Sequence, residues 1–270
     1  MTVHALPGKR VLITGAQGGI AQASIAALRA GGATVYGVDL RAGDDVRAAD
    51  VRDPDAMLSA VAAAVERMGG IDILVNCAGI GTAQDVGSMP GDEVRRTIDI
   101  NLLGPWTTTA AALPHLLAAH GHVVNVTSVL AVISLPFASA YSASKHALDA
   151  YSNCLRIEYH GRVSVTTVRP GYVRTHIHDG PAQRGVSLEG VTNEDSVEQA
   201  AAAIVRACTH RPRTVVTSRS TAVGIWFGQH LPRLVERAII RRGSRYQLAG
   251  LGPAPEGNVE GQVDSGRGAR

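Results

Sequence analysis

Tyr141 and Lys145 stand four residues apart at the start of "YSASKHALDAYSNCLRIEYHG", a segment with the composition of a helix. At this spacing both side chains lie on one helix face, about one turn apart. A phenol titrates near pH ~10 in water, and a neighbouring ammonium favours its ionised form. Tyr141 is therefore a candidate general base for an alcohol, or general acid for a carbonyl. Taken alone, the pair also fits an ordinary exposed pair on a helix.

Two further polar residues fit the same chemistry. Ser128 ends the strand-like run "HVVNVTS", and open α/β sheets bind ligands at the carboxyl ends of their strands. Its hydroxyl is a candidate to hold a substrate oxygen, with Thr127 and Ser134 as alternatives, although strand-end serines commonly only form turns. Asn101, in "TIDINLLG", is a poor helix former within an apolar helical stretch. It therefore marks either a site or a helix irregularity.

A glycine-bearing turn opens the first strand-and-helix unit, "VLITGAQGGIAQASIAALRAGG". Gly15, Gly18, Gly19 and Ile20 form the turn and the helix start, where backbone N–H groups can receive a pyrophosphate. The spacing departs from GxGxxG, and a glycine-rich turn of this kind also serves packing alone. The turn predicts a dinucleotide site only together with its context.

Asp39, at the end of the next strand-like run "ATVYGVDL", supplies that context. A carboxylate there accepts hydrogen bonds from both ribose hydroxyls and repels a 2′-phosphate, which favours NAD over NADP. Asp39 also fits an ordinary polar strand end. Arg41, two positions on, leaves NADP as the less favoured cofactor.

Short β-branched runs alternate with longer alanine-rich stretches along the chain. Six of them predict strands: "RVLIT", "ATVYGVD", "IDILVN", "HVVNVTS", "RVSVTTVRP" and "RTVVTS". A seventh, weaker candidate lies near "DDVRAADV". Continuous apolar strands separated by helices predict an α/β fold, with a doubly wound parallel sheet covered on both faces. We expect one domain over residues 1–249 and a disordered tail at 250–270, where Gly, Pro and polar residues prevail.

Composition narrows the function classes. The 270 residues are 45% hydrophobic, lack an apolar run of membrane-spanning length and begin without a signal-peptide core, so we expect a soluble cytoplasmic protein. An aromatic content of 4% and a net charge of +3 disfavour a nucleic-acid surface. Cys77, Cys154 and Cys208 are too widely spaced to indicate disulfides or zinc. With only His176 and His178 close together, we expect no metal.

Together these residues resemble the short-chain dehydrogenase/reductase family over roughly residues 9–217. The matching segments are "TGAQGGIA", "NCAG", "RPGYVRT" and the set Asn101, Ser128, Tyr141 and Lys145. This combination in this order is highly specific. The resemblance implies a Rossmann-type fold, a small-molecule alcohol or ketone substrate, and a homo-oligomer, either a dimer or a tetramer.

The resemblance also implies residue roles. Tyr141 would be the general acid/base, and Ser128 would position the substrate oxygen. Lys145 would lower the tyrosine pKa and hold the nicotinamide ribose, and Asn101 would complete a water-linked proton path to Lys145. The further cofactor residues implied are Asp50 and Val51 at the adenine, Asn76, Ala78 and Gly79 along the cofactor, Pro170 and Gly171 after the sixth strand, and Val173 or Thr175 at the carboxamide.

Two positions depart from the family pattern. Ala21 replaces the third glycine of the turn, which adds one methyl group where the helix approaches the strand. Cys77 replaces the second asparagine of Asn-Asn-Ala-Gly and removes an amide that supports the sheet. We expect Ala21 to cost packing freedom without preventing cofactor binding, and Cys77 to stay buried.

We therefore expect an NAD-dependent oxidoreductase that transfers a hydride between nicotinamide and a secondary alcohol or ketone, with lipid-like and alicyclic compounds as candidate substrates. The alternative is a regulatory or structural protein that binds dinucleotide without turnover. The intact Asn-Ser-Tyr-Lys set favours the enzyme. Residues 175–197 are polar and glycine-bearing, and we expect them to cover the pocket as a lid.

The segment 220–245 predicts a C-terminal helical extension beyond the chemistry-bearing part. Apolar residues recur there at helical spacing from a start near Pro232: Leu231, Leu234, Val235, Ala238 and Ile239. Residues 210–245 contain eight arginines and one acid, a net charge of +7. The favoured interpretation is that the stripe packs on the domain or on a sister subunit. The alternative is that Trp226 and Phe227, with the stripe and the arginines, contact an anionic membrane.

Overall fold

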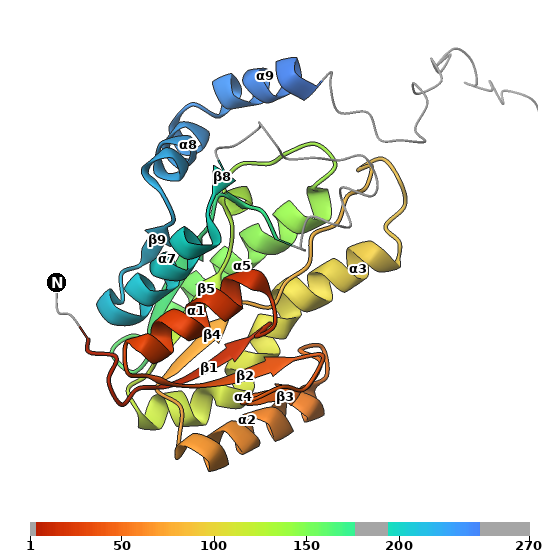
Figure 1. Ribbon diagram of the computed structural model, residues 1–270. Coiled ribbons are helices and arrows are strands. Elements are labelled where there is room, and N and C mark those ends of the chain that lie inside the picture. The colour runs from red at the N-terminus through yellow and green to blue at the C-terminus, as the bar shows by residue number, and fades with distance from the viewer. Residues whose placement is uncertain (1–3, 176–193, 244–270) are drawn as a thin grey trace, which may run out of the picture.

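The computed structural model describes residues 4–175 and 194–243. Seven strands in this part of the chain form one parallel sheet in the order β3-β2-β1-β4-β5-β6-β9 (Figure 1). They are β1 (Arg10–Thr14), β2 (Thr34–Asp39), β3 (Val46–Ala48), β4 (Ile73–Asn76), β5 (His122–Val126), β6 (Ser164–Arg169) and β9 (Thr214–Val216). The chain builds outward from β1 through β2 to β3, then returns to the other side of β1 with β4. The predicted doubly wound parallel sheet is confirmed, including its weak seventh strand.

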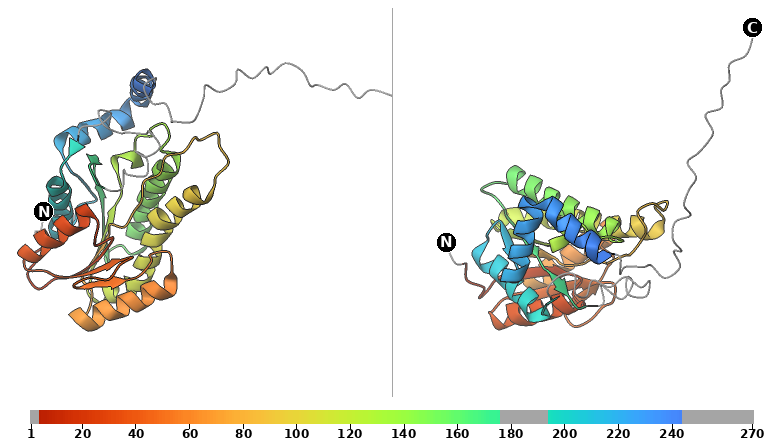
Figure 2. Two further views of the ribbon diagram at one scale, coloured as in Figure 1. Left: turned by 45° about the vertical axis from the view of Figure 1, so that its right-hand side comes forward. Right: turned by 90° about the horizontal axis from the view of Figure 1, so that it is seen from above.

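Helices cover both faces of the sheet (Figures 1 and 2). The helices that pack on it are α1 (Gly19–Ala30) and α7 (Val197–His210) on one face, and α2 (Pro54–Met68), α4 (Gly104–Ala118) and α5 (Ser139–Glu158) on the other. A shorter helix, α3 (Asp92–Ile98), joins α4 through a π-turn, Asp99–Leu103. Both faces of the sheet are therefore shielded from solvent, which explains why the strands are continuous apolar runs in the sequence.

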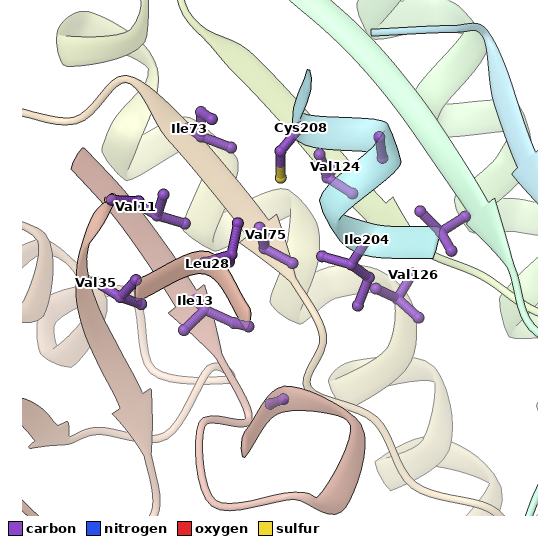
Figure 3. Packing of buried hydrophobic residues seen from close by; sticks show 14 of the residues in the cluster. Val11, Ile13, Leu28, Val35, Ile73, Val75, Val124, Val126, Ile204 and Cys208 are labelled. Atoms are coloured by element: carbon purple, nitrogen blue, oxygen red, sulfur yellow. The ribbon is translucent and has the colours of Figure 1, made fainter. Parts of the chain in front are cut away.

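Alternation along each strand divides the core into two clusters. In β1, Val11 and Ile13 point to one face and pack with Leu28 of α1 and Ile204 of α7 (Figure 3). Leu12, between them, belongs to the cluster on the opposite face, with Met57 of α2 and Leu116 of α4. Period-two geometry thus lets one strand anchor helices on both sides.

The C-terminal extension contains two helices, α8 (Arg219–His230) and α9 (Pro232–Gly243). The helix predicted to begin near Pro232 is confirmed as α9. The helical extension expected over 220–245 begins one residue earlier, as α8 at Arg219. There the Ser218 side chain caps the helix by accepting a hydrogen bond from the Thr221 N–H. The expected lid at 175–197 lies largely, and the expected tail at 250–270 entirely, outside the described residues.

The apolar stripe of α9 is divided between two environments. Val235 and Ile239 are half-buried, and Ile239 packs against a cluster around Leu130 and Leu135. Leu234 and Ala238 are exposed. The extension therefore packs on the domain through one edge of the stripe and leaves the other in contact with solvent. No helix within the described ranges has both the length and the apolar content needed to cross a membrane.

The turn after β1 touches the chain after β4. Gly15 has φ +68, and a Cβ placed there would lie 2.7 Å from the Ala78 Cα and 2.9 Å from the Ala78 N. The Thr14 hydroxyl reinforces the contact by accepting hydrogen bonds from the Cys77 and Ala78 N–H groups, both at 3.2 Å. Only glycine fits this approach, because any side chain would meet backbone atoms that cannot turn aside.

Gly15→Ala is expected to destabilise the fold more than Gly8→Ala, a matched control at φ +75 with no atom within 4 Å of the added Cβ. Both changes place a side chain in the left-handed region, at a cost of about 1–2 kcal/mol. Only Gly15→Ala also forces backbone apart, which adds about 1–3 kcal/mol. Urea denaturation measures both. Equal losses in the two variants would show that the turn relaxes freely and that the contact is unimportant.

Stability is expected to fall with acid partly because of His122. This side chain is fully buried in β5, and its Nε2 lies 2.9 Å from the Thr166 hydroxyl. Burial lowers the pKa of His122 from 6.5 to about 3, so the folded ring stays neutral while the unfolded ring takes a proton. Its contribution is complete above pH 6.5 and declines by about 1.4 kcal/mol per pH unit as the pH falls from there toward the folded pKa.

His122→Gln is therefore expected to flatten the dependence of the unfolding free energy on pH in this range, whatever its effect on absolute stability. His160→Gln, at an exposed position, is the control and should keep the parent slope. Urea titrations at several pH values on the acid side of neutrality give the slopes. A slope unchanged by His122→Gln would contradict the assignment.

Candidate active site

A cavity of about 530 Å³ opens at the carboxyl ends of the strands. Its wall comes from the segments that follow β1, β4, β5 and β6, together with α5. Twelve of the predicted site residues line it: Gly15, Gly18, Gly19, Ile20, Gly79, Ser128, Tyr141, Lys145, Pro170, Gly171, Val173 and Thr175. The fold thus brings residues from across the chain to one hollow.

Tyr141 and Ser128 face each other in this cavity. The first turn of α5 carries Tyr141, and Ser128 stands just after β5 and caps a short 3₁₀ turn by accepting the Leu130 N–H at 3.1 Å. Burial raises the pKa of Tyr141 to about 12, and its hydrogen bond with Ser128 opposes that rise. At neutral pH the phenol therefore keeps its proton and can donate it.

The alternative hydroxyls are less suited to hold a substrate. Thr127 also lines the cavity, but its hydroxyl donates to the Val168 carbonyl at 3.0 Å. Ser134 is exposed and is not among the residues of the cavity wall. Ser128 is therefore the hydroxyl best placed beside Tyr141.

Lys145 lies one helical turn after Tyr141 and is buried. Its Nζ donates to the Val126 carbonyl at 3.0 Å and lies 5.7 Å from the centroid of the Tyr141 ring. Burial lowers the pKa of Lys145 to about 8. The raised pKa of Tyr141 reflects burial first. Burial therefore sets the direction of the tyrosine pKa in this structure, and the lowering by Lys145 that the resemblance implies stays a prediction.

Asn101 lies on the π-turn between α3 and α4 and is completely buried. Its Oδ1 accepts the Ile80 N–H at 2.9 Å, and its Nδ2 donates to the Ile80 carbonyl at 2.9 Å and to the Ser144 hydroxyl at 3.1 Å. Both interpretations of Asn101 therefore apply, since it sits on a helix irregularity and lies next to the site. π-turns are rare and occur frequently at functional sites.

Other predicted cofactor residues lie away from the cavity wall. Asp39 ends β2, where its carboxylate accepts the Gln17 N–H at 2.9 Å and the Leu40 N–H at 2.7 Å, so it stands beside the glycine turn. Asp50 pairs with Arg52 at 2.6 Å. The position of Asp39 beside the turn fits the outer end of an extended ligand.

Asn76, Val51 and Ala78 have structural contacts. Asn76 is buried, and its Nδ2 donates to the Thr109 hydroxyl at 3.1 Å and to the Asn125 Oδ1 at 2.8 Å, which links β4, α4 and β5. Val51 packs in the core near Gly104. Ala78 makes the close contact with Gly15. The side chains of these three residues are occupied by contacts within the protein. Any contact with a cofactor would therefore come mainly from their backbone atoms.

The wall also contains residues that sequence reasoning did not select. Cys77 was expected to stay buried, but it is only half-buried, because it lines the cavity close to Lys145. Partial burial still raises the pKa of its thiol to about 11. The others include Ile80, Gly81, Thr82, Glu93, Arg96, Leu130 and Leu135. Nothing in their local sequence marks them, because each is ordinary for the helix or loop in which it lies.

One buried carboxylate supports the wall from behind. Asp195 lies in the short strand β8 (Glu194–Asp195), which pairs with β7 (Tyr172–Val173). It accepts the Gly171 N–H at 3.0 Å, the Thr221 hydroxyl at 2.9 Å and the Thr217 hydroxyl. Asp195 thereby joins the Pro170–Gly171 turn to the end of β9 and the start of α8. No local pattern indicates this role, because the partners are 22 to 26 residues away.

Metal ligands are not grouped in the described ranges. No set of three His, Cys, Asp or Glu side chains there could hold an ion, and His176 and His178 fall outside those ranges.

Comparison with known proteins agrees with this geometry. The family model described as short chain dehydrogenase matches residues 9–183. The dehydrogenase/reductase SDR family member 7B of Mus musculus is 35% identical over 158 residues, which are 58% of this chain and 49% of the mouse protein. The chain spans about half the length of the mammalian relatives it matches.

Two solved structures share the fold. A short chain dehydrogenase from Burkholderia cenocepacia J2315, in complex with NADP, has a TM-score of 0.74 and 26% identity, covering 88% of this chain and 98% of that one. One from Mycobacterium paratuberculosis, bound to NAD, has a TM-score of 0.72 and 22% identity, covering 81% and 99%. The family match extends over more than half of the chain and includes the glycine turn, Ser128, Tyr141 and Lys145. The chain belongs to the short-chain dehydrogenase family.

Proposed function

We propose that this protein is an NAD(P)-dependent oxidoreductase, with NAD preferred, that interconverts a secondary alcohol and its ketone. The observation that carries the proposal is the meeting of Ser128, Tyr141 and Lys145 at one cavity that also contains the glycine turn. A protein that only bound dinucleotide would have no chemical need for that trio. Cytoplasmic location and homo-oligomeric assembly stay predictions from the sequence.

The chain's own features fit a dinucleotide. No side chain in the described ranges caps the N-terminus of α1 at Gly18, and its first turn has no acid, so its N–H groups suit phosphate oxygens. The wall at Gly79, Lys145 and Thr175 would hold the nicotinamide half, and Asp39 the adenosine ribose. A bound nicotinamide dinucleotide supplies the hydride acceptor or donor.

Tyr141 would handle the proton. Because burial keeps the pKa of its hydroxyl high, Tyr141 donates to a carbonyl oxygen that Ser128 holds by a second hydrogen bond. In the reverse direction the Lys145 ammonium, 5.7 Å from the ring, stabilises the phenolate that forms. Asn101 contributes by fixing Ser144, the residue before Lys145.

The apolar part of the wall supports an apolar substrate. Val129, Leu130 and Leu135 line the cavity and belong to the same apolar cluster as Tyr141. A ketone or alcohol with an alicyclic or lipid-like body would bury that body against these side chains. A small polar substrate would leave these apolar side chains exposed to water.

Tyr141→Phe is expected to lower kcat about 10²–10⁴-fold, because it removes the proton donor and no cofactor contact beyond one hydroxyl. The dissociation constant for NADH should stay within about twofold, since the ring remains. Activity is followed by NADH absorbance over a panel of alicyclic and long-chain ketones. Tyr159→Phe, at the opposite end of α5, is the control. A near-parental kcat in Tyr141→Phe would contradict the role of Tyr141 as the proton donor. NADH binding by the parent without turnover on any panel member would favour the non-catalytic alternative.

Asp39→Ala is expected to narrow the preference for NADH over NADPH, because it removes the carboxylate that repels a 2′-phosphate. Isothermal titration of both cofactors against the parent and the variant measures the change. Arg41→Gln is the companion variant: it should leave NADH affinity unchanged and should weaken NADPH if that exposed guanidinium contacts the phosphate. Tighter binding of NADPH than NADH by the parent would overturn the NAD preference.

A further inference from the structure

The outer faces of α8 and α9 expose large apolar side chains. Trp226 and Phe227 are 51% and 43% exposed, and Leu234 on α9 is 55% exposed. The two aromatic rings meet edge to face at 5.2 Å, and Trp226 also stacks on His230 at 4.8 Å. Packing with the domain does not require these side chains, because Ile225 and Ile239 provide it from the inner faces.

The same helices have a net positive charge larger than that of the whole chain. Residues 219–243 contain five arginines and one acid, a net +4, where the whole chain has +3. Arg233 and Arg237 are exposed, and neither forms an ion pair with another described residue. Leu234, Arg237 and Ala238 fall at i, i+3 and i+4 and are all exposed, so cationic and apolar groups share one helix face.

The charge decides between two occupants of this surface. A second copy in a two-fold interface would place the exposed Arg233 and Arg237 of one copy against the same arginines of the other, and like charges across an interface are costly. An anionic lipid bilayer offers the opposite charge together with an apolar interior for the rings and Leu234. Tryptophan at a membrane boundary is favourable for the same reason, since its ring is apolar and its N–H is polar.

We propose that α8 and α9 form a binding surface for anionic lipid bilayers, composed of Trp226, Phe227, Arg233, Leu234 and Arg237. This proposal goes beyond the proposed reaction and does not depend on turnover. Both helices lie together at one end of the molecule, at the top in Figure 1 and in the left view of Figure 2.

The surface is directly connected to the cavity. Ile225 of α8 and Ile239 of α9 pack in the cluster that contains Val129, Leu130 and Leu135, which also line the cavity. Two helices at a bilayer would therefore hold the apolar wall of the site within one helix thickness of the lipid. An apolar substrate dissolved in that lipid would have a short way to Tyr141.

Co-sedimentation tests the proposal with the full-length protein. The probes are vesicles of phosphatidylglycerol mixed with phosphatidylcholine, and vesicles of phosphatidylcholine alone, at low salt and at about 0.15 M salt. Binding is expected to the anionic vesicles only and to weaken with salt. Arg233→Gln with Arg237→Gln should lower the partition coefficient about 30-fold, at about fivefold for each arginine. Arg29→Gln with Arg67→Gln, two exposed arginines on other helices, is the charge-matched control and should bind like the parent.

The two tryptophans of the chain, Trp106 and Trp226, give an independent signal. In Trp106→Phe the remaining fluorophore is Trp226, and its emission should shift to shorter wavelength with anionic vesicles. In Trp226→Phe the remaining fluorophore is Trp106, which is exposed on α4 and should not shift. Trp226→Ala with Phe227→Ala should abolish sedimentation while NADH titration stays at the parental value, which shows that the fold is intact.

Three results would overturn the proposal. The first is a lack of binding to anionic vesicles at low salt. The second is binding that the α8 and α9 variants do not alter. The third is a concentration-dependent dimer, seen by sedimentation velocity without lipid, that Trp226→Ala with Phe227→Ala dissociates, since this would assign the surface to a second copy. If the parent protein did not bind NADH or did not turn over any substrate, that result would contradict the proposed function and leave the lipid-binding proposal unchanged.

Discussion

The Asn101 side chain is the constraint on which the arrangement of the site depends. One buried amide bonds both backbone groups of Ile80, after β4, and the hydroxyl of Ser144, on α5. Ser144 lies between Tyr141 and Lys145 on the chain, so the amide fixes the helix of the reacting groups relative to the sheet. Each buried bond that loses its partner costs about 1–3 kcal/mol, and the amide has no second arrangement that would satisfy all three.

The fold could be predicted from the sequence because its signals are local. β-branched runs between alanine-rich stretches are sufficient to identify six strands, and Pro232 with its apolar spacing identifies α9. β3 gave a weak signal because its three residues lie at the edge of the sheet and are largely exposed. The extension was expected to be helical from residue 220, but only α9 could be identified within it as a separate helix. The apolar residues of α8, Val223, Trp226 and Phe227, follow no clear period, although Ser218 is a standard capping residue.

The site was predictable only in part. Tyr141 and Lys145 could be identified by their spacing on one helix, and the glycine turn by its place after a strand. Arg96 and Asp195 reach the site through tertiary packing, and no local pattern distinguishes such residues from ordinary surface or loop positions. The poor helix propensity of Asn101 indicated an irregularity, but whether it would be a kink, a break or a π-turn depends on partners in distant segments.

The hydroxyl cluster at Asp195 makes the C-terminal extension part of the catalytic domain's framework. The same carboxylate that receives the Gly171 N–H also receives the Thr221 hydroxyl from the first turn of α8. Cutting the chain ahead of Thr221 would leave the buried carboxylate of Asp195 with fewer hydrogen-bond donors. It would thereby destabilise the Pro170–Gly171 turn, which lines the cavity far from the cut. For protein engineering, α8 and α9 therefore cannot be exchanged for another segment without affecting the cavity wall. A fusion at the C-terminal side has to be joined after α9 and not before α8.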